Sequence, residues 1–202
     1  MLIGSRRQAR KQQTGKILKN ALVDLILENN NVQEITVSEI ADRADLNRGT
    51  FYIHYKDKHE IIEDLFTDAL EGIRQALRDP YKNVDRVILD GIVPSTKLLF
   101  EHIENHRNLF KALDLIQKIP DLYDRLEYEI RKILFEDIQL QLEQDPSEVE
   151  YEIYASYVVH ATLGVIKYWI QSNFKYSTNF MCEQLTLIYS HRISALIIKR
   201  GE

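Results

Sequence analysis

The chain has 202 residues, of which 45% are hydrophobic and 28% charged, a balance typical of a folded globular protein rather than a disordered one. Its single cysteine, Cys182, excludes a disulfide framework within one chain and a cysteine-based zinc site. The net charge of −5 is unevenly distributed, because residues 1–20 carry six basic residues and no acidic one. That end would attract a polyanion, although a basic terminus can also serve solubility alone. With only 7 Gly and 4 Pro the turns are few, which favours an all-α protein.

In chain order, apolar residues at helical spacing predict a first helix over about 14–28, which the asparagines at 29–31 end. A second helix is predicted to begin at Thr36, because Thr36 and Glu39 have the spacing of a capping box. After a turn at Asp45 and Leu46, Asn47 is a good N-cap for a third helix over about 48–55.

A long fourth helix follows, with Asp57 and Glu60 as a second capping box and Pro80 just beyond its end. We expect two domains, residues 1–60 and 61–202, joined by this helix over 57–78. Five further helical patterns bring the total to about nine helices: 83–105, 107–118, 120–143, 147–173 and 178–199. Pro94 is expected to kink or split the first of them, and Asp145, Pro146 and Glu148 mark the start of the fourth.

The second and third helices, with their short turn, form a helix-turn-helix pattern. Phe51 and Tyr55 are four residues apart and can pack inward, so that the outer face presents Arg48, Gly49, Thr50 and Tyr52. A guanidinium, a hydroxyl and a glycine that permits close approach are suited to reading base edges in the DNA major groove. Periodicity alone is also compatible with an ordinary amphipathic helix.

From Thr36 to Ile61 the order of residues closely resembles the DNA-binding signature of the TetR family of bacterial transcriptional regulators. The residues that carry the resemblance are Thr36, Ile40, Ala41, Gly49, Thr50, Phe51, Tyr52, His54, Tyr55 and Lys58. Two positions depart from the pattern: Asp45 stands at the usual turn glycine and can still adopt left-handed geometry, and Asn47 stands at the usual serine cap.

The resemblance implies an N-terminal three-helix DNA-binding domain and a C-terminal helical domain for dimerisation and effector binding. It implies a sequence-specific regulator, most often a repressor, that a small-molecule effector releases from a pseudo-palindromic operator. The residues implied to contact base edges are Asn47, Arg48, Gly49 and Thr50. The residues implied to contact phosphates are Thr36, Tyr52, His54 and Lys58.

The C-terminal half gives less specific indications. Residues 157–185, with Gly164 and Trp169, are similar to the C-terminal domain of a TetR subgroup that includes the regulator of dihydroxyacetone kinase genes. The last two helices are apolar on more than one face, which predicts a four-helix dimer interface or, alternatively, burial inside one protomer. The residues predicted for the interface are Ser156, His160, Gly164, Leu185 and Ile188.

A partly apolar effector is expected between the helices of residues 83–143, in a pocket lined by Phe100, Phe110, Tyr123 and Tyr128, although each of these aromatics could equally fill the core. His102 and His106 have a spacing that two metal ligands can use, but without an evident third ligand we expect a solvent-facing helix end, with no metal and no cofactor. Ser156, His160 and Asp124 lack the loops of a hydrolase triad, so we expect no enzyme.

Two rival functions remain open. One is a coactivator or protein-binding paralogue that no longer reads an operator, and the other is a helical enzyme that uses a C-terminal cavity. No apolar run reaches the length of a membrane span, and we expect a cytoplasmic protein that is nucleoid-associated when bound to DNA.

Overall fold

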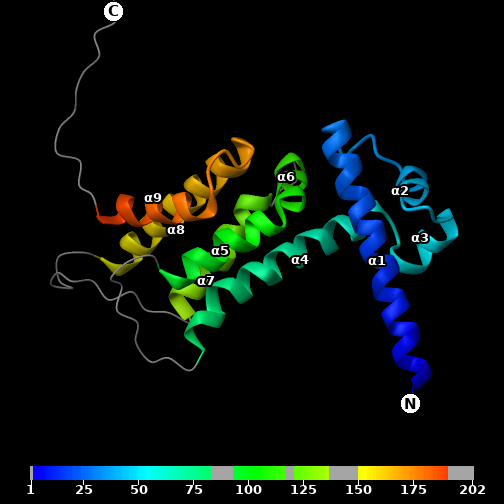
Figure 1. Ribbon diagram of the computed structural model, residues 1–202, viewed down its shortest axis with the longest axis horizontal. Helices are drawn as coiled ribbons and strands as arrows, with labels where there is room; N and C mark the ends of the chain where they lie inside the picture. The colour runs from blue at the N-terminus through cyan, green and yellow to red at the C-terminus, as the bar shows by residue number, and fades with distance from the viewer. Residues whose placement is uncertain (1, 83–92, 117–120, 137–149, 191–202) are drawn as a thin grey trace, which may run out of the picture.

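The computed structural model describes residues 2–82, 93–116, 121–136 and 150–190. Within these ranges the chain is built from α-helices, one short 3-10 turn at Asp79–Tyr81 and no strand, in agreement with the predicted all-α fold (Figure 1). The helices are α1 (Leu2–Asn29), α2 (Val37–Arg43), α3 (Arg48–His54), α4 (Lys58–Arg78), α5 (Pro94–Asn105), α6 (Arg107–Leu115), α7 (Leu122–Glu136), α8 (Tyr151–Gln171) and α9 (Thr178–Ser190).

The starts of α2, α3 and α4 predicted from capping residues are confirmed. Thr36 and Glu39 form the complete capping box of α2, and the side chain of Asn47 accepts the backbone N–H of Thr50 at the start of α3. Asp57 caps α4 by accepting the N–H of Glu60. The reciprocal half of that second box is not formed as predicted, because the Glu60 carboxylate accepts the N–H of Lys56 instead.

Helix α1 is longer than the sequence predicts, and the helix at Pro94 is described from that residue onwards. α1 starts at Leu2 instead of near Thr14. The polar stretch before Thr14 is also helical, and the sequence prediction missed it because its apolar periodicity is weak. Pro94 stands at the first position of α5, where its missing N–H costs nothing, which agrees with a split of the predicted 83–105 helix at this residue; the predicted part before it, 83–92, lies outside the described residues. The predicted start of the penultimate helix at 145–148 lies outside the described residues.

Helix α4 runs from the helix-turn-helix to the α5–α9 bundle and packs against α5, α6 and α7 (Figure 1). It is not the only contact between the two parts, because α1 also packs against α6. The buried apolar side chains form one continuous cluster from Leu18 in α1 to Leu185 in α9. The division into residues 1–60 and 61–202 therefore stays an interpretation based on helix grouping.

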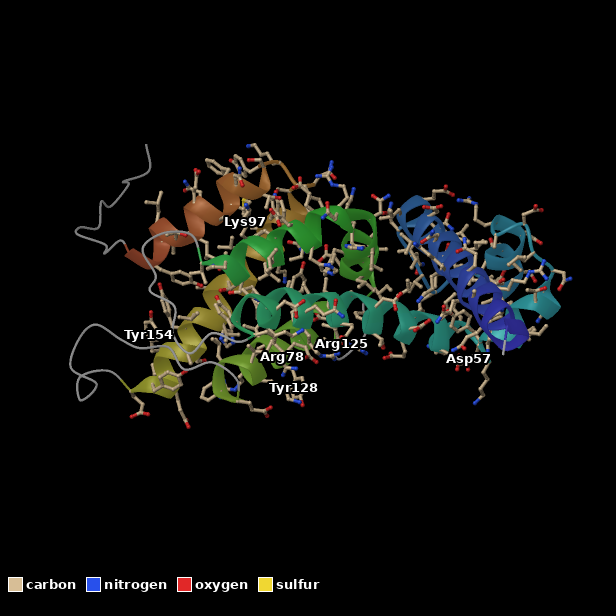
Figure 2. The ribbon with its side chains drawn as sticks, turned by 60° about the horizontal axis from the view of Figure 1, so that its bottom comes forward. Asp57, Arg78, Lys97, Arg125, Tyr128 and Tyr154 are labelled. Carbon is tan, nitrogen blue, oxygen red and sulfur yellow. The ribbon has the colours of Figure 1, made fainter. Side chains whose placement is uncertain are left out.

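Ion pairs fasten α4 to its neighbours on both sides. Lys19 of α1 pairs with Asp64 at 3.2 Å and also with Asp68. On the α7 side, Arg125, which is labelled in Figure 2, donates two hydrogen bonds to Glu63 of α4, at 2.9 and 3.1 Å.

A second bidentate pair joins the same two helices further along. Arg74 of α4 donates to Glu129 of α7 at 2.7 and 2.9 Å, and the Glu129 side chain is only 8% exposed. Because a nearly buried carboxylate must keep its partner, this pair holds α4 against α7.

α4 and α5 approach closely where Gly72 faces His102. A Cβ at Gly72 would lie 2.0 Å from Cε1 of His102, so glycine leaves room for the imidazole. The ring lies 4.5 Å from that of His106 and meets Phe110 edge-on. Burial, and the neighbouring His106, lower the pKa of His102. The prediction of a solvent-facing helix end is therefore wrong for His102, which packs against α4.

No helix of the described residues is long and apolar enough to cross a membrane. Nor do these residues gather three His, Cys, Asp or Glu side chains in a way that could hold a metal ion.

Candidate nucleic-acid interface

Helix α3 is anchored to the core by its two inward-facing aromatic residues. Phe51 is fully buried and Tyr55 nearly so, as the four-residue spacing predicts. The Tyr55 hydroxyl donates to Asp64 of α4 at 2.7 Å, and burial together with this carboxylate raises the pKa of Tyr55. One end of α3 is thus fixed to α4, so a tilt of α4 would move the helix that presents the candidate base-reading residues.

The turn before α3 has the geometry that the sequence allowed. Asp45 has φ 54°, in the left-handed region where its family counterpart is usually glycine. The next residue, Leu46, donates its N–H to the carbonyl of Ala41 at 2.9 Å, which closes the turn onto α2.

The N-terminal end of α3 presents the four predicted base-reading residues, with Asn47, Arg48 and Gly49 exposed and Thr50 half-buried. Asn47 is occupied as the cap, since its Oδ1 accepts both the N–H and the hydroxyl of Thr50. Arg48 donates to the Tyr52 hydroxyl at 3.0 Å, so its guanidinium lies over the outer face of the helix. Of the four, Arg48 and Gly49 are the most accessible to a base edge.

Ile53 is a candidate that the sequence reasoning missed. Its side chain is 72% exposed, although a large apolar residue gains nothing from water there. It lies one turn after Gly49 and opposite buried Phe51, so the two residues share the outward face of α3. An apolar side chain at this place suits the methyl group of thymine. The available signal was its spacing of two residues from Phe51, which puts it on the far side of a helix.

The predicted phosphate contacts surround this face, but they differ in availability. Tyr52 is 47% exposed beside Arg48. Thr36 is exposed, yet its hydroxyl donates to Glu39 at 2.7 Å within the capping box. His54 is half-buried, and burial followed by the charge of Lys11 lowers its pKa. A phosphate bond from Thr36 therefore requires its hydroxyl to leave Glu39.

Lys58 is bound internally. Its ammonium donates to the backbone carbonyls of Val32 at 2.8 Å, Gln33 at 3.0 Å and Ile35 at 2.7 Å, and burial lowers its pKa. An ammonium has three N–H donors, so this set uses all of them. Lys58 braces the loop before α2 against the start of α4, and its predicted phosphate contact stays a prediction.

The residues predicted for the dimer interface are only partly brought together. Ser156 is half-buried on α8, while His160 and Gly164 are exposed there. Ile188 of α9 is 44% exposed, but Leu185 is 1% exposed. The predicted placement of Leu185 at an interface is therefore wrong, because its side chain packs inside the protomer. Other large apolar side chains of α8 and α9 are also substantially exposed: Ile153, Tyr157, Tyr168, Phe180 and Leu187.

The four residues predicted to line an effector pocket do not surround one cavity. Phe100 is fully buried against Trp169, with ring centroids 5.2 Å apart, and Phe110 is fully buried beside His102. Tyr123 donates to Asp114 at 2.6 Å, and Tyr128 is 63% exposed. The single pocket expected from these aromatics is thus corrected, since two of them are core residues.

An open groove lies between α4 and α7, with a volume of about 370 Å³. Its lining residues are Leu70, Asp124, Arg125, Tyr128 and Glu129. Arg125 and Tyr128 both lie along this side of α4 (Figure 2).

A capped two-helix unit with an exposed, partly basic second helix is a helix-turn-helix of the DNA-binding class. Two family models match the chain: one described as bacterial regulatory proteins of the tetR family over residues 27–65, and one described as a transcriptional regulator C-terminal region over residues 92–191. The chain belongs to the TetR family of bacterial transcriptional regulators, whose members bind DNA and are dimers.

Curated relatives and solved structures agree with this assignment. The chain is 28% identical over 160 residues to the HTH-type transcriptional regulator YxbF of Bacillus subtilis, covering 77% of this chain and 39% of that relative. It is 22% identical to the nucleoid occlusion factor SlmA of Vibrio vulnificus, covering 95% of this chain and all of SlmA. The dihydroxyacetone kinase operon activator DhaS shares the fold with a TM-score of 0.60 at 17% identity, over 87% of this chain and 93% of DhaS.

Proposed function

We propose that this protein is a dimeric, sequence-specific transcriptional regulator that reads a pseudo-palindromic operator with α3 and acts as a repressor. The observation that carries the proposal is the outward face of α3, where Arg48, Gly49 and Ile53 are exposed while Phe51 anchors the opposite face. A helix presented in this way fits the major groove, and a two-fold dimer would read two half-sites one helical turn apart.

The dimer face is proposed on α8 and α9. Their exposed apolar side chains, among them Ile153, Tyr168 and Leu187, would leave a large hydrophobic area in water on an isolated protomer. Gly164 lies on α8, and a Cβ added there would meet nothing within 4 Å. The open space beside Gly164 is where a helix of a second copy would approach closely.

Regulation is proposed to pass through α4. The Arg125–Glu63 and Arg74–Glu129 pairs fasten α4 to α7, and Tyr55 fastens α3 to α4. A small amphipathic effector in the α4–α7 groove would compete with these pairs and shift α4, and with it the spacing of the two α3 helices. Linkage requires DNA to weaken effector binding by the same factor as effector weakens DNA binding.

The proposal is tested by measuring the affinity of the purified dimer for DNA fragments from its own upstream region, at several salt concentrations. Tyr52→Ala is expected to weaken binding on all sequences alike, because a phosphate contact carries no base information. Leu98→Ala is the control, an apolar residue on α5 that is 38% exposed and lies outside both the α3 face and the α4–α7 groove, so we expect it to leave DNA affinity unchanged. Equal effects of the two variants would contradict the proposed role of α3.

Lys58→Met distinguishes two roles of Lys58, as a brace between the loop before α2 and the start of α4 or as a phosphate contact. As a brace, Lys58 should contribute to thermal stability and leave the dependence of log K on log salt unchanged. As a phosphate contact, its loss should lower that slope by about one unit.

A second candidate is a DNA-bound protein whose main task is not the control of a promoter. It is favoured by the full-length similarity to relatives named nucleoid occlusion factors, at 22% identity. Sequencing the genomic DNA that the protein retains distinguishes the two. A few sites at promoters support the regulator, whereas many dispersed sites far from promoters support the second candidate. If the protein turned over a compound and had no affinity for DNA, an enzyme would be supported instead, which we do not propose.

A further inference from the structure

The N-terminal half of α1 extends beyond the body of the protein. The C-terminal half packs in the core, where Leu18, Leu22 and Ile26 are fully buried. Towards the N-terminus the helix leaves α2 and α3 and projects outward (Figure 1). The six residues over this part whose side chains are described are all exposed: Gln8, Ala9, Arg10, Lys11, Gln12 and Gln13. These turns of helix have no packing partner within the described protomer.

The charge of this extension is unfavourable for an isolated helix. The extension, residues 2–14, contains four basic residues and no acidic one, and the first acidic residue of the chain is Asp24. Positions 6 and 10, and positions 7 and 11, are basic pairs one turn apart, and like charges at this spacing repel. An anionic partner would relieve this repulsion.

The extension starts beside the DNA-reading helix. At Gly15 a Cβ would lie 3.5 Å from Oη of Tyr55 and 3.8 Å from Nδ1 of His54, so α1 touches the C-terminal end of α3 there. Lys11 lies one turn further out on α1, and its charge acts on His54. The basic turns are therefore continuous with the face proposed to contact DNA.

We propose that the N-terminal turns of α1 bind phosphates of the DNA backbone next to those beneath α3, and so lengthen each half-site. From Thr14 to Leu2 the helix rises by about 18 Å, which corresponds to about five base pairs of B-DNA. The contact is sequence-independent, because it is made by charged side chains on phosphates. This inference rests on the proposed operator binding and adds a second contact to it.

The test compares the double variant Arg10→Gln/Lys11→Gln with wild type on the same operator. Glutamine keeps a good helix propensity, so α1 is retained while two charges are lost. Losing two phosphate contacts should lower the slope of log K against log salt by about 1.8. The order of preference among operator variants should stay the same, and hydroxyl-radical protection should shorten at the edge of each half-site. The matched control is Gln12→Ala/Gln13→Ala, which changes the same exposed turns without changing charge.

The outcomes separate this inference from the proposed function. If wild-type protein binds no operator, the proposed function fails. If wild type binds and the double variant has an unchanged slope and footprint, only the α1 contact is overturned. Vesicles of 30% phosphatidylglycerol in phosphatidylcholine provide the third measurement. If the double variant loses binding to these vesicles but keeps the operator slope, the extension is a membrane-binding surface and the DNA contact is likewise overturned.

Discussion

Replacing Gly164 with leucine adds a bulky side chain to the exposed face of α8. In the isolated protomer the change is harmless, because a Cβ at this position meets nothing within 4 Å and the residue lies inside a helix. Leucine is a better helix former than glycine by about 0.5–1 kcal/mol. The folded protomer should therefore become slightly more stable.

The dimer should respond in the opposite direction. Inserting extra methylenes into a packed contact costs about 1–3 kcal/mol. A two-fold axis repeats the substitution on both protomers, so the dimer loses about 2–6 kcal/mol. At about 1.4 kcal/mol per tenfold, its dissociation constant rises by about one and a half to four orders of magnitude. Operator affinity should fall with it.

Sedimentation equilibrium over a wide concentration range measures the dimer constant, and thermal unfolding at a concentration where both proteins are monomeric measures the protomer. Gly164→Ala is the intermediate variant, with the helix gain but little added bulk. An unchanged dimer constant for Gly164→Leu would refute the α8 interface. A large loss of protomer stability would refute the reading of Gly164 as open surface.

Three further predictions concern stability and specificity. Arg74→Ala leaves the nearly buried Glu129 carboxylate unpaired and should lower the free energy of unfolding by about 3 kcal/mol, while Arg74→Met/Glu129→Met should be close to neutral. Urea unfolding at fixed protein concentration checks both variants. A loss of less than about 1 kcal/mol for the single variant would contradict the stabilising role of the Arg74–Glu129 pair. The pKa of His102 in the folded protein is lowered by burial and then by His106. As the pH falls through about 6.5, the unfolded state therefore binds more protons than the folded state, and stability present above that pH should be lost below it. His102→Gln should flatten this pH dependence in thermal melts from pH 5 to 8. Ile53→Ser should cost about 1 kcal/mol on sites with thymine at one position and less on others, whereas an equal loss on every site would assign Ile53 a role other than base reading.

The sequence predicted the helix-turn-helix well because local chemistry determines it. The caps at Thr36, Asn47 and Asp57 depend on side chains within three residues of the backbone groups they bind, and the structure has all three. The left-handed turn at Asp45 was foreseen for the same reason. Interactions of this range are visible in a single sequence.

Long-range packing was less accessible. The ammonium of Lys58 binds carbonyls more than 20 residues away in sequence, and no local pattern reveals that it is used there. Leu185 and Ile188 both suit an apolar helix face, yet only the packing of α9 decides that Leu185 faces inward. Phe100 and Phe110 likewise fill the core, because the neighbouring helices close around them.

The contact between α1 and α6 bears on how such regulators can be recombined. A chimera that keeps α4 onwards but takes its first three helices from another regulator would inherit a foreign surface against α6, as well as a foreign partner for Asp64 and Asp68. The helix-turn-helix of the chimera would be uncoupled from the retained C-terminal domain unless the side of the new α1 that faces α6 were also matched. Exchanging operator specificity while keeping regulation is therefore better done by grafting the exposed residues of α3 and its N-cap, within residues 47–53, than by exchanging the whole N-terminal part.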